Sequence, residues 1–131
     1  MKPKIYFTSA EHKQRWFESL LKIERIYKGG AFDPRYGSAL YILTADAGMW
    51  HVAQNYVSRE GLEIETFLKE VHLSTSESVL TRLAGNLFNP TSLHVDPVEF
   101  MVFDESNFAV AMSAISIRYR GLHVTDIKEG E

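Results

Sequence analysis

The sequence predicts an all-α fold, built as one compact domain of five to six short and medium helices over residues 1–131. Apolar residues recur at helical spacing in most segments, and capping or stop residues separate those segments. No alternation of strands and helices suggests a nucleotide-binding α/β fold. The chain is 45% apolar and has no cysteine, and its 131 residues are enough to bury a single core without disulfides.

The first predicted helix runs to about residue 28. It begins at Thr8 or Ser9, and Thr8 with Glu11 has the spacing of a capping box. The pair Gly29–Gly30 predicts its end. Its apolar residues recur at helical spacing and predict a face toward the core: Trp16, Leu20, Ile23 and Tyr27. Residues 1–7 are expected to form an extended arm.

A second helix is predicted after Asp33 and Pro34, an N-cap followed by proline in the first turn. Because no charged residue occurs between Arg35 and Asp46, we expect this helix to be buried on several sides. Gly48 is expected to end it. Three apolar residues then indicate another short helix over residues 49–57: Trp50, Ala53 and Val57.

The middle of the chain predicts two more helices. Ser58 begins a new cap, and the apolar residues between Leu62 and Leu73 favour a helix over a strand. The run at residues 74–77 offers several N-caps for a helix that Asn89 and Pro90 close. Four residues of that helix share one apolar face: Leu80, Leu83, Ala84 and Leu87.

The final helix is predicted to follow an irregular segment over residues 91–104, in which Asp96 and Pro97 begin one helical turn. Asp104 caps the helix and Gly121 ends it. Four apolar residues at helical spacing predict its core face: Phe108, Met112, Ile115 and Tyr119. Apolar and polar residues also alternate over 115–120, which leaves a strand open there. Residues 124–131 are expected to fray.

Charge is unevenly distributed along the chain. Residues 1–28 contain seven basic and three acidic side chains, a balance of +4, whereas the remaining 103 contain seven basic and fourteen acidic ones, a balance of −7. The first helix is thus a candidate for docking on an acidic surface. The spacing of Glu11 with Arg15 and of Glu18 with Lys22 favours a solvated helix face instead. The net charge of −3 makes nucleic acid an unlikely partner.

Residues at the N-terminus lack the pattern of a secretory signal, and no run of 18 apolar residues occurs, which predicts a cytoplasmic protein without a membrane segment. The five histidines do not pair at helical spacing, and no phosphate-binding glycine loop or nucleophile elbow is present. We therefore predict no metal, no cofactor and no catalytic residue. Four aspartates are explained as caps or turn residues: Asp33, Asp46, Asp96 and Asp104.

One polar constellation is a candidate anion site. Arg82 and Asn86 are four residues apart on one face of a predicted helix, and Arg118 ends the last element. With His94, the nearest histidine, they are expected to converge on an anionic ligand if the two helices pack. The favoured alternative is structural: Arg82 and Asn86 bind loop carbonyls or pair with Asp96 or Asp104, which holds the irregular segment in place.

A helix-turn-helix motif is a further interpretation of residues 78–89, but residues 83–117 contain no Lys or Arg to bind DNA. Four blocks in order, FTSAEHKQRW, ALYILTAD, LTRLAGNLFN and AISIRYRG, resemble a family of small bacterial and phage-borne proteins of unknown function. The resemblance implies a cytoplasmic protein that a phage or another mobile element encodes. It implies no reaction.

The first functional hypothesis is a non-catalytic module that binds a protein partner or forms a homo-oligomer. Its candidate interface residues are aromatic: Trp16, Tyr27 and Trp50. The alternatives are an anion-binding protein or enzyme that uses the Arg82 constellation, and a weak nucleic-acid-associated regulator that uses the basic first helix.

Overall fold

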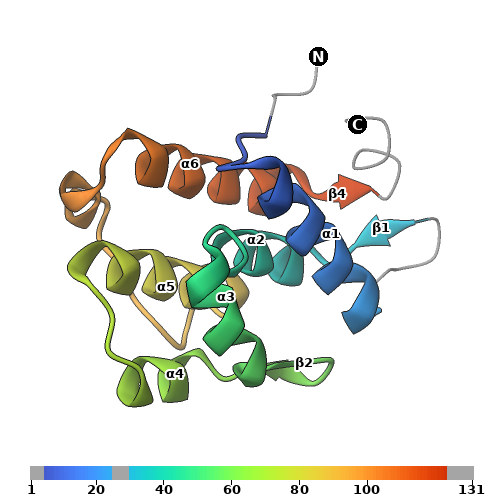
Figure 1. The fold of residues 1–131 in the computed structure, drawn as a ribbon, viewed down its shortest axis with the longest axis horizontal. Helices are drawn as coiled ribbons and strands as arrows, with labels where there is room; N and C mark the ends of the chain where they lie inside the picture. Colours follow the sequence, from blue (N-terminus) through green and yellow to red (C-terminus); the bar gives the residue numbers. More distant parts are fainter. Residues whose placement is uncertain (1–4, 25–29, 124–131) are drawn as a thin grey trace.

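The computed structural model describes residues 5–24 and 30–123, and most of them are helical (Figure 1). The α-helices in these ranges are α1 (Ala10–Ile23), α2 (Pro34–Leu43), α3 (Ala47–Ala53), α4 (Ile64–Glu70), α5 (Thr75–Phe88) and α6 (Glu105–Arg120). Two 3-10 helices are η1 (Gln54–Tyr56) and η2 (Pro97–Val102). No helix within the described ranges is long and apolar enough to cross a membrane.

Two small antiparallel sheets depart from the all-α prediction, although the prediction of a mainly helical chain is confirmed. One sheet pairs β1 (Ala31–Phe32) with β4 (Leu122–His123), and the other pairs β2 (Val57–Ser58) with β3 (Gly61–Leu62). Phe32 lies opposite Leu122 in the first sheet. Each strand has two residues, which is too short for alternation of apolar and polar residues to reveal it.

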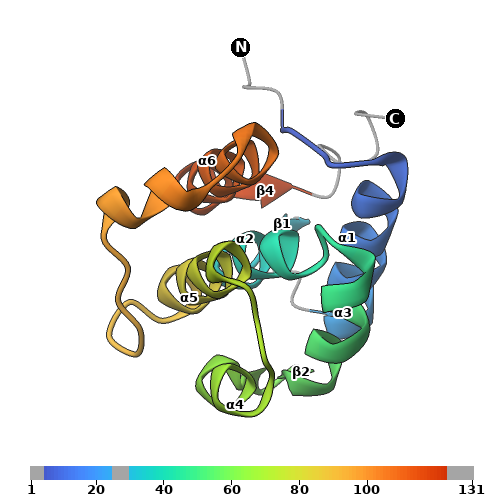
Figure 2. The same cartoon turned by 60° about the vertical axis from the view of Figure 1, so that its left-hand side comes forward.

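Helix α2 is the centre of the fold, where it contacts α1, α3, α5 and α6 (Figure 2). The side chain of Asp33 accepts a hydrogen bond from the Arg35 amide (3.0 Å), and Pro34 occupies the first turn, as predicted. Every residue from Tyr36 to Leu43 is buried, because α2 packs against α1, α5 and α6. The predicted burial of this helix on several sides is confirmed.

Helix α1 begins at Ser9, whose side chain accepts a hydrogen bond from the His12 amide (3.1 Å). Thr8 is not the cap; its hydroxyl donates to the Ala45 carbonyl (2.8 Å) and holds the start of α1 against the end of α2. The helix ends at Ile23, before the predicted stop, because Glu24 adopts a left-handed conformation (φ 59°). Residues 25–29, which include the rest of the predicted helix, lie outside the described residues.

The segment after α2 differs from its prediction. Helix α2 ends at Leu43, and Asp46 caps α3 by accepting from the Met49 amide (2.9 Å), so Gly48 lies inside α3 rather than at a helix end. The predicted helix over 49–57 is replaced by the end of α3, by η1 and by β2. The helix predicted between Leu62 and Leu73 is the shorter α4.

Helices α5 and α6 have the predicted caps. Ser74 and Glu77 form a capping box at α5, and Asp104 accepts from the Asn107 amide (2.7 Å) at α6. Helix α6 continues to Arg120, so the strand interpretation of residues 115–120 is wrong. Its core face was also wrongly predicted, because other residues of α6 are buried: Val110, Ala111, Ala114 and Ile117.

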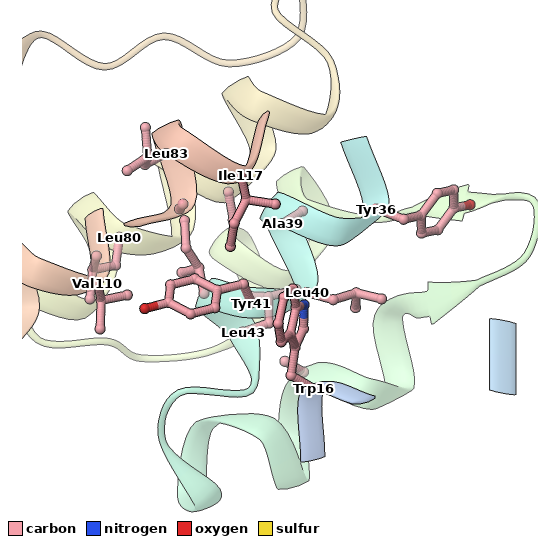
Figure 3. Close-up of a cluster of buried hydrophobic side chains, with 14 of the residues drawn as sticks. Trp16, Tyr36, Ala39, Leu40, Tyr41, Leu43, Leu80, Leu83, Val110 and Ile117 are labelled. Atoms are coloured by element: carbon pink, nitrogen blue, oxygen red, sulfur yellow. The ribbon is translucent and has the colours of Figure 1, made fainter. Parts of the chain in front are cut away.

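The core lies between α1, α2, α5 and α6 (Figure 3). Trp16 is buried on the α1 side of α2, where its indole Nε1 donates to the Gly37 carbonyl (2.9 Å). From α6, Val110 and Ile117 reach into the same cluster. Two of the buried residues of α6, Ala111 and Ala114, have small side chains that let this helix lie close to α2.

Candidate functional site

Arg82, the first residue of the predicted anion site, forms an ion pair with Glu99 of the same chain. Its guanidinium contacts both carboxylate oxygens of Glu99, at 2.5 and 3.1 Å, and also donates to the His94 carbonyl (3.2 Å). This two-pronged bond lowers the pKa of Glu99 to about 2, assisted by the Asp96 amide. The charge of Arg82 is therefore balanced by an acid that the prediction had not considered.

The other predicted site residues bind backbone or face solvent. The amide of Asn86 donates to the Leu93 carbonyl (2.7 Å), and Arg118 donates to the Leu87 carbonyl at the end of α5 (2.9 Å). The imidazole of His94 is exposed and lies 3.5 Å from Asp96. Arg82 and Asn86 thus hold residues 93–99 against α5, as the structural alternative expected, but Arg82 pairs with Glu99 instead of Asp96 or Asp104.

Two of the three predicted interface aromatics can be placed. Trp16 is only 1% exposed, so its assignment to an interface is wrong: its ring fills the core beside α2. Trp50 is half-buried and borders a surface groove. Tyr27 lies outside the described residues.

This groove has a volume of about 370 Å³ and runs between α1, α3 and β2. Three basic side chains line it, Arg15, Lys22 and Arg59, together with the acidic Glu18. Arg15 also donates to the Thr44 carbonyl (2.8 Å), which fixes its guanidinium at the wall. Because Arg59 lies 3.7 Å from the Glu24 carboxylate, the groove combines an indole with a small excess of positive charge.

His12 is a buried titratable group of the core. Its Nε2 lies 2.8 Å from the Tyr41 carbonyl, and the Thr8 amide donates to its Nδ1 (3.2 Å). Only the neutral ring with its proton on Nε2 satisfies both contacts. Burial, aided by the nearby Arg15 charge, lowers the pKa of His12 to about 4 against the effect of the Tyr41 bond. His12 is therefore a neutral structural residue at pH 7.

The surface feature that sequence reasoning missed is on α6. Four side chains that were predicted to face the core are exposed, by 48% for Phe108, 38% for Met112, 38% for Ile115 and 85% for Tyr119. We call these four residues the α6 face. Every exposed position between Glu105 and Arg120 belongs to it. A surface helix ordinarily has polar residues on its solvent side, so this composition is unusual.

The surroundings of the α6 face extend its apolar character. η2, at the N-terminal end of α6 (Figure 1), has three further exposed apolar side chains: Val98, Met101 and Val102. The arm at residues 5–7 lies along a different side of α6, where the Tyr6 amide donates to Ser113 Oγ (3.2 Å) and its hydroxyl hydrogen-bonds Ser106 (3.0 Å). The arm therefore contacts two serines of α6, and the four side chains of the α6 face stay exposed beside it.

The sequence does contain a signal for this face. Helix α6 has no charged residue from 106 to 117, and two apolar stripes compete for the core. A helix that is apolar on more than one side needs more than one apolar neighbour. The choice between the stripes depends on which one fits closely against α2, and spacing alone does not reveal that.

No group of three metal-ligating side chains lies together among residues 5–24 and 30–123. Comparison of the chain with protein-family models, with curated proteins and with solved structures gives no match. The support for the two candidate sites, the apolar α6 face and the basic groove, therefore comes from the residues of the chain.

Proposed function

We propose that this chain is a non-catalytic, cytoplasmic protein-binding module that acts through the α6 face. The observation that supports this proposal is that every exposed position of α6 between Glu105 and Arg120 is apolar. Water contact with these side chains is unfavourable by roughly 25 cal/mol per Å², so covering them with a protein partner releases free energy. Arg82 and Asn86, two residues of the predicted anion site, instead bind residues 93–99.

The spacing of the α6 face supports a helical partner. Its residues are separated by four, three and four positions, which is the a and d pattern of paired helices. Phe108 and Tyr119 are also residue types that are enriched at protein interfaces. The proposed link to a phage or mobile element rests on the resemblance described above, and the binding proposal does not depend on it.

Site-specific photo-crosslinking in living cells tests this function. A benzophenone amino acid replaces Tyr119 on the α6 face or, as a control, Leu21, which is an apolar residue of α1 with 43% exposure. We expect a protein adduct from position 119 and none from position 21. Equal adduct formation at the two positions, or none at position 119, would contradict the proposal.

The basic groove is the basis of a second candidate function, the binding of a small multivalent anion. Three cations and one acid line it, and the half-buried Trp50 provides an apolar wall. Calorimetric titration with inorganic phosphate is expected to show binding that Lys22→Glu abolishes. Because Lys22 is exposed, this variant is expected to stay folded and to lose only about 1 kcal/mol through its repulsion from Glu18 and its place at the end of α1. Absence of binding heat with the wild-type protein at low salt would exclude phosphate as the ligand.

A further inference from the structure

The partner that best fits the α6 face is a second copy of this chain. We propose that two α6 helices pack antiparallel across a two-fold axis, which rests on the proposed function of the α6 face and names its occupant. Three features of α6 support this arrangement: the symmetry of its spacing, the distribution of its charges and the size of its apolar surface.

The intervals between residues of the α6 face are four, three and four from either end of the helix. A two-fold axis that passes between Ser113 and Ala114 places Phe108 opposite Tyr119 of the second copy and Met112 opposite Ile115. An isologous interface requires this self-complementarity, because the same surface supplies both sides. Each of the four side chains of one α6 face then contacts a side chain of the α6 face in the second copy.

The charges of α6 select the antiparallel orientation. Asp104 and Glu105 lie at its N-terminal end, and Arg118 and Arg120 lie at its C-terminal end, with no charged residue between them. Antiparallel packing brings the acidic end of each helix beside the basic end of the other, and the two helix dipoles are also opposed. Parallel packing would bring acids together at one end and arginines together at the other.

The apolar area is that of a modest interface. A fully exposed large side chain presents about 200 Å², so the four exposures of the α6 face amount to about 400 Å² per copy. A stable specific interface buries about 800 Å² per partner. The exposed apolar residues of η2 adjoin the N-terminal end of α6, so in an antiparallel pair they lie beside the C-terminal end of the second helix and enlarge the contact. We therefore expect a concentration-dependent dimer.

Thiol cross-linking tests the orientation, and the absence of native cysteine removes any background. Phe108→Cys and Tyr119→Cys are made as separate proteins, mixed, and treated with a bis-maleimide that spans about one helix-to-helix distance, roughly 10 Å. We expect a cross-linked dimer in the mixture alone. In an antiparallel pair, two copies of position 119 are separated by about 16 Å along the axis, beyond the reach of this reagent.

Charge-reversal variants test the antiparallel orientation independently, with the strength of the dimer measured by sedimentation velocity. Glu105→Arg is expected to weaken the dimer about tenfold, because both ends of the pair lose an attraction and gain a repulsion. Mixing it with Arg120→Glu is expected to restore association. The matched control is Glu11→Arg, the same change in the first turn of α1, and it is expected to leave association unchanged. Circular dichroism confirms that each variant is folded.

The results of these experiments distinguish the antiparallel dimer from the more general proposal that the α6 face binds a protein. Cross-linking of Tyr119→Cys to itself would indicate a parallel pair and overturn the arrangement. No cross-link in the mixture, together with a monomer at every concentration, would overturn the second copy as the occupant. A photo-adduct at position 119 with a different protein would overturn it as well, while leaving the α6 face as a docking surface.

Discussion

Acidification is expected to destabilise this protein through His12, and the magnitude follows from its environment. The neutral ring is buried between α1 and α2, where both nitrogens are hydrogen-bonded. Its pKa is about 4 in the folded protein and 6.5 in the unfolded chain. The unfolded state therefore binds more protons than the folded state between these values, so stability falls as the pH falls.

The His12 contribution is complete above pH 6.5 and is lost as the pH falls to about 4. One pKa unit corresponds to 1.36 kcal/mol, so the loss at pH 4 is about 3 kcal/mol. Urea unfolding between pH 7.5 and 4, followed by tryptophan fluorescence, measures it. The comparison variant is His12→Gln, which does not titrate in this range, so the difference in slope between the two proteins isolates the histidine.

A pH dependence that is parallel in wild-type and His12→Gln proteins would refute this reasoning. It would mean that the imidazole is equally easy to protonate in the folded and unfolded states. The constant loss of stability that the substitution itself causes does not affect the comparison, because only the change with pH is used.

Three further predictions concern α5. In Gly85→Ala, the new Cβ would lie 2.2 Å from Leu93 Cδ1 and 3.0 Å from Ile64 Cγ2, so we expect a loss of about 1–2 kcal/mol in urea unfolding, and an unchanged midpoint would contradict this packing. Thr81→Val removes a buried hydroxyl that has no hydrogen-bond partner among the described residues and should add about 1 kcal/mol; a loss would indicate a partner. Glu99→Gln should accelerate amide hydrogen exchange over residues 93–103, whereas unchanged exchange would mean that the ion pair does not hold this segment.

Local signals in the sequence predicted the helices well where a cap and an apolar stripe agreed. Asp33, Ser74 and Asp104 all cap the helices that they were expected to begin. The cap at Asp46 was recognised as a cap or turn residue, yet the helix after it was placed too late. The reason is that Gly48 is compatible with a helix interior, and it lies there because Asp46 already begins a new helix.

The candidate sites were harder to predict because they depend on contacts between distant segments. The partner of Arg82 is Glu99, 17 residues away and in a segment without strong periodicity. Trp16 was predicted both for the core face of the first helix and for an interface, because aromatic content alone does not show which rings the core accommodates; its burial confirms the core face. The α6 face was assigned to the core for a related reason, since Phe108 and Val110 belong to competing stripes of one helix and the shape of α2 decides between them.

The α6 face is exposed in the isolated chain, and the proposed function requires a partner to cover it in the cell. Hydroxyl-radical labelling measures this directly as the ratio of modification at Met112 to modification at Leu21, both of which are exposed in the structure. We expect this ratio to be several-fold lower in intact cells than in dilute purified protein, because a partner shields Met112 and leaves Leu21 accessible. An equal ratio in the two conditions would contradict the claim.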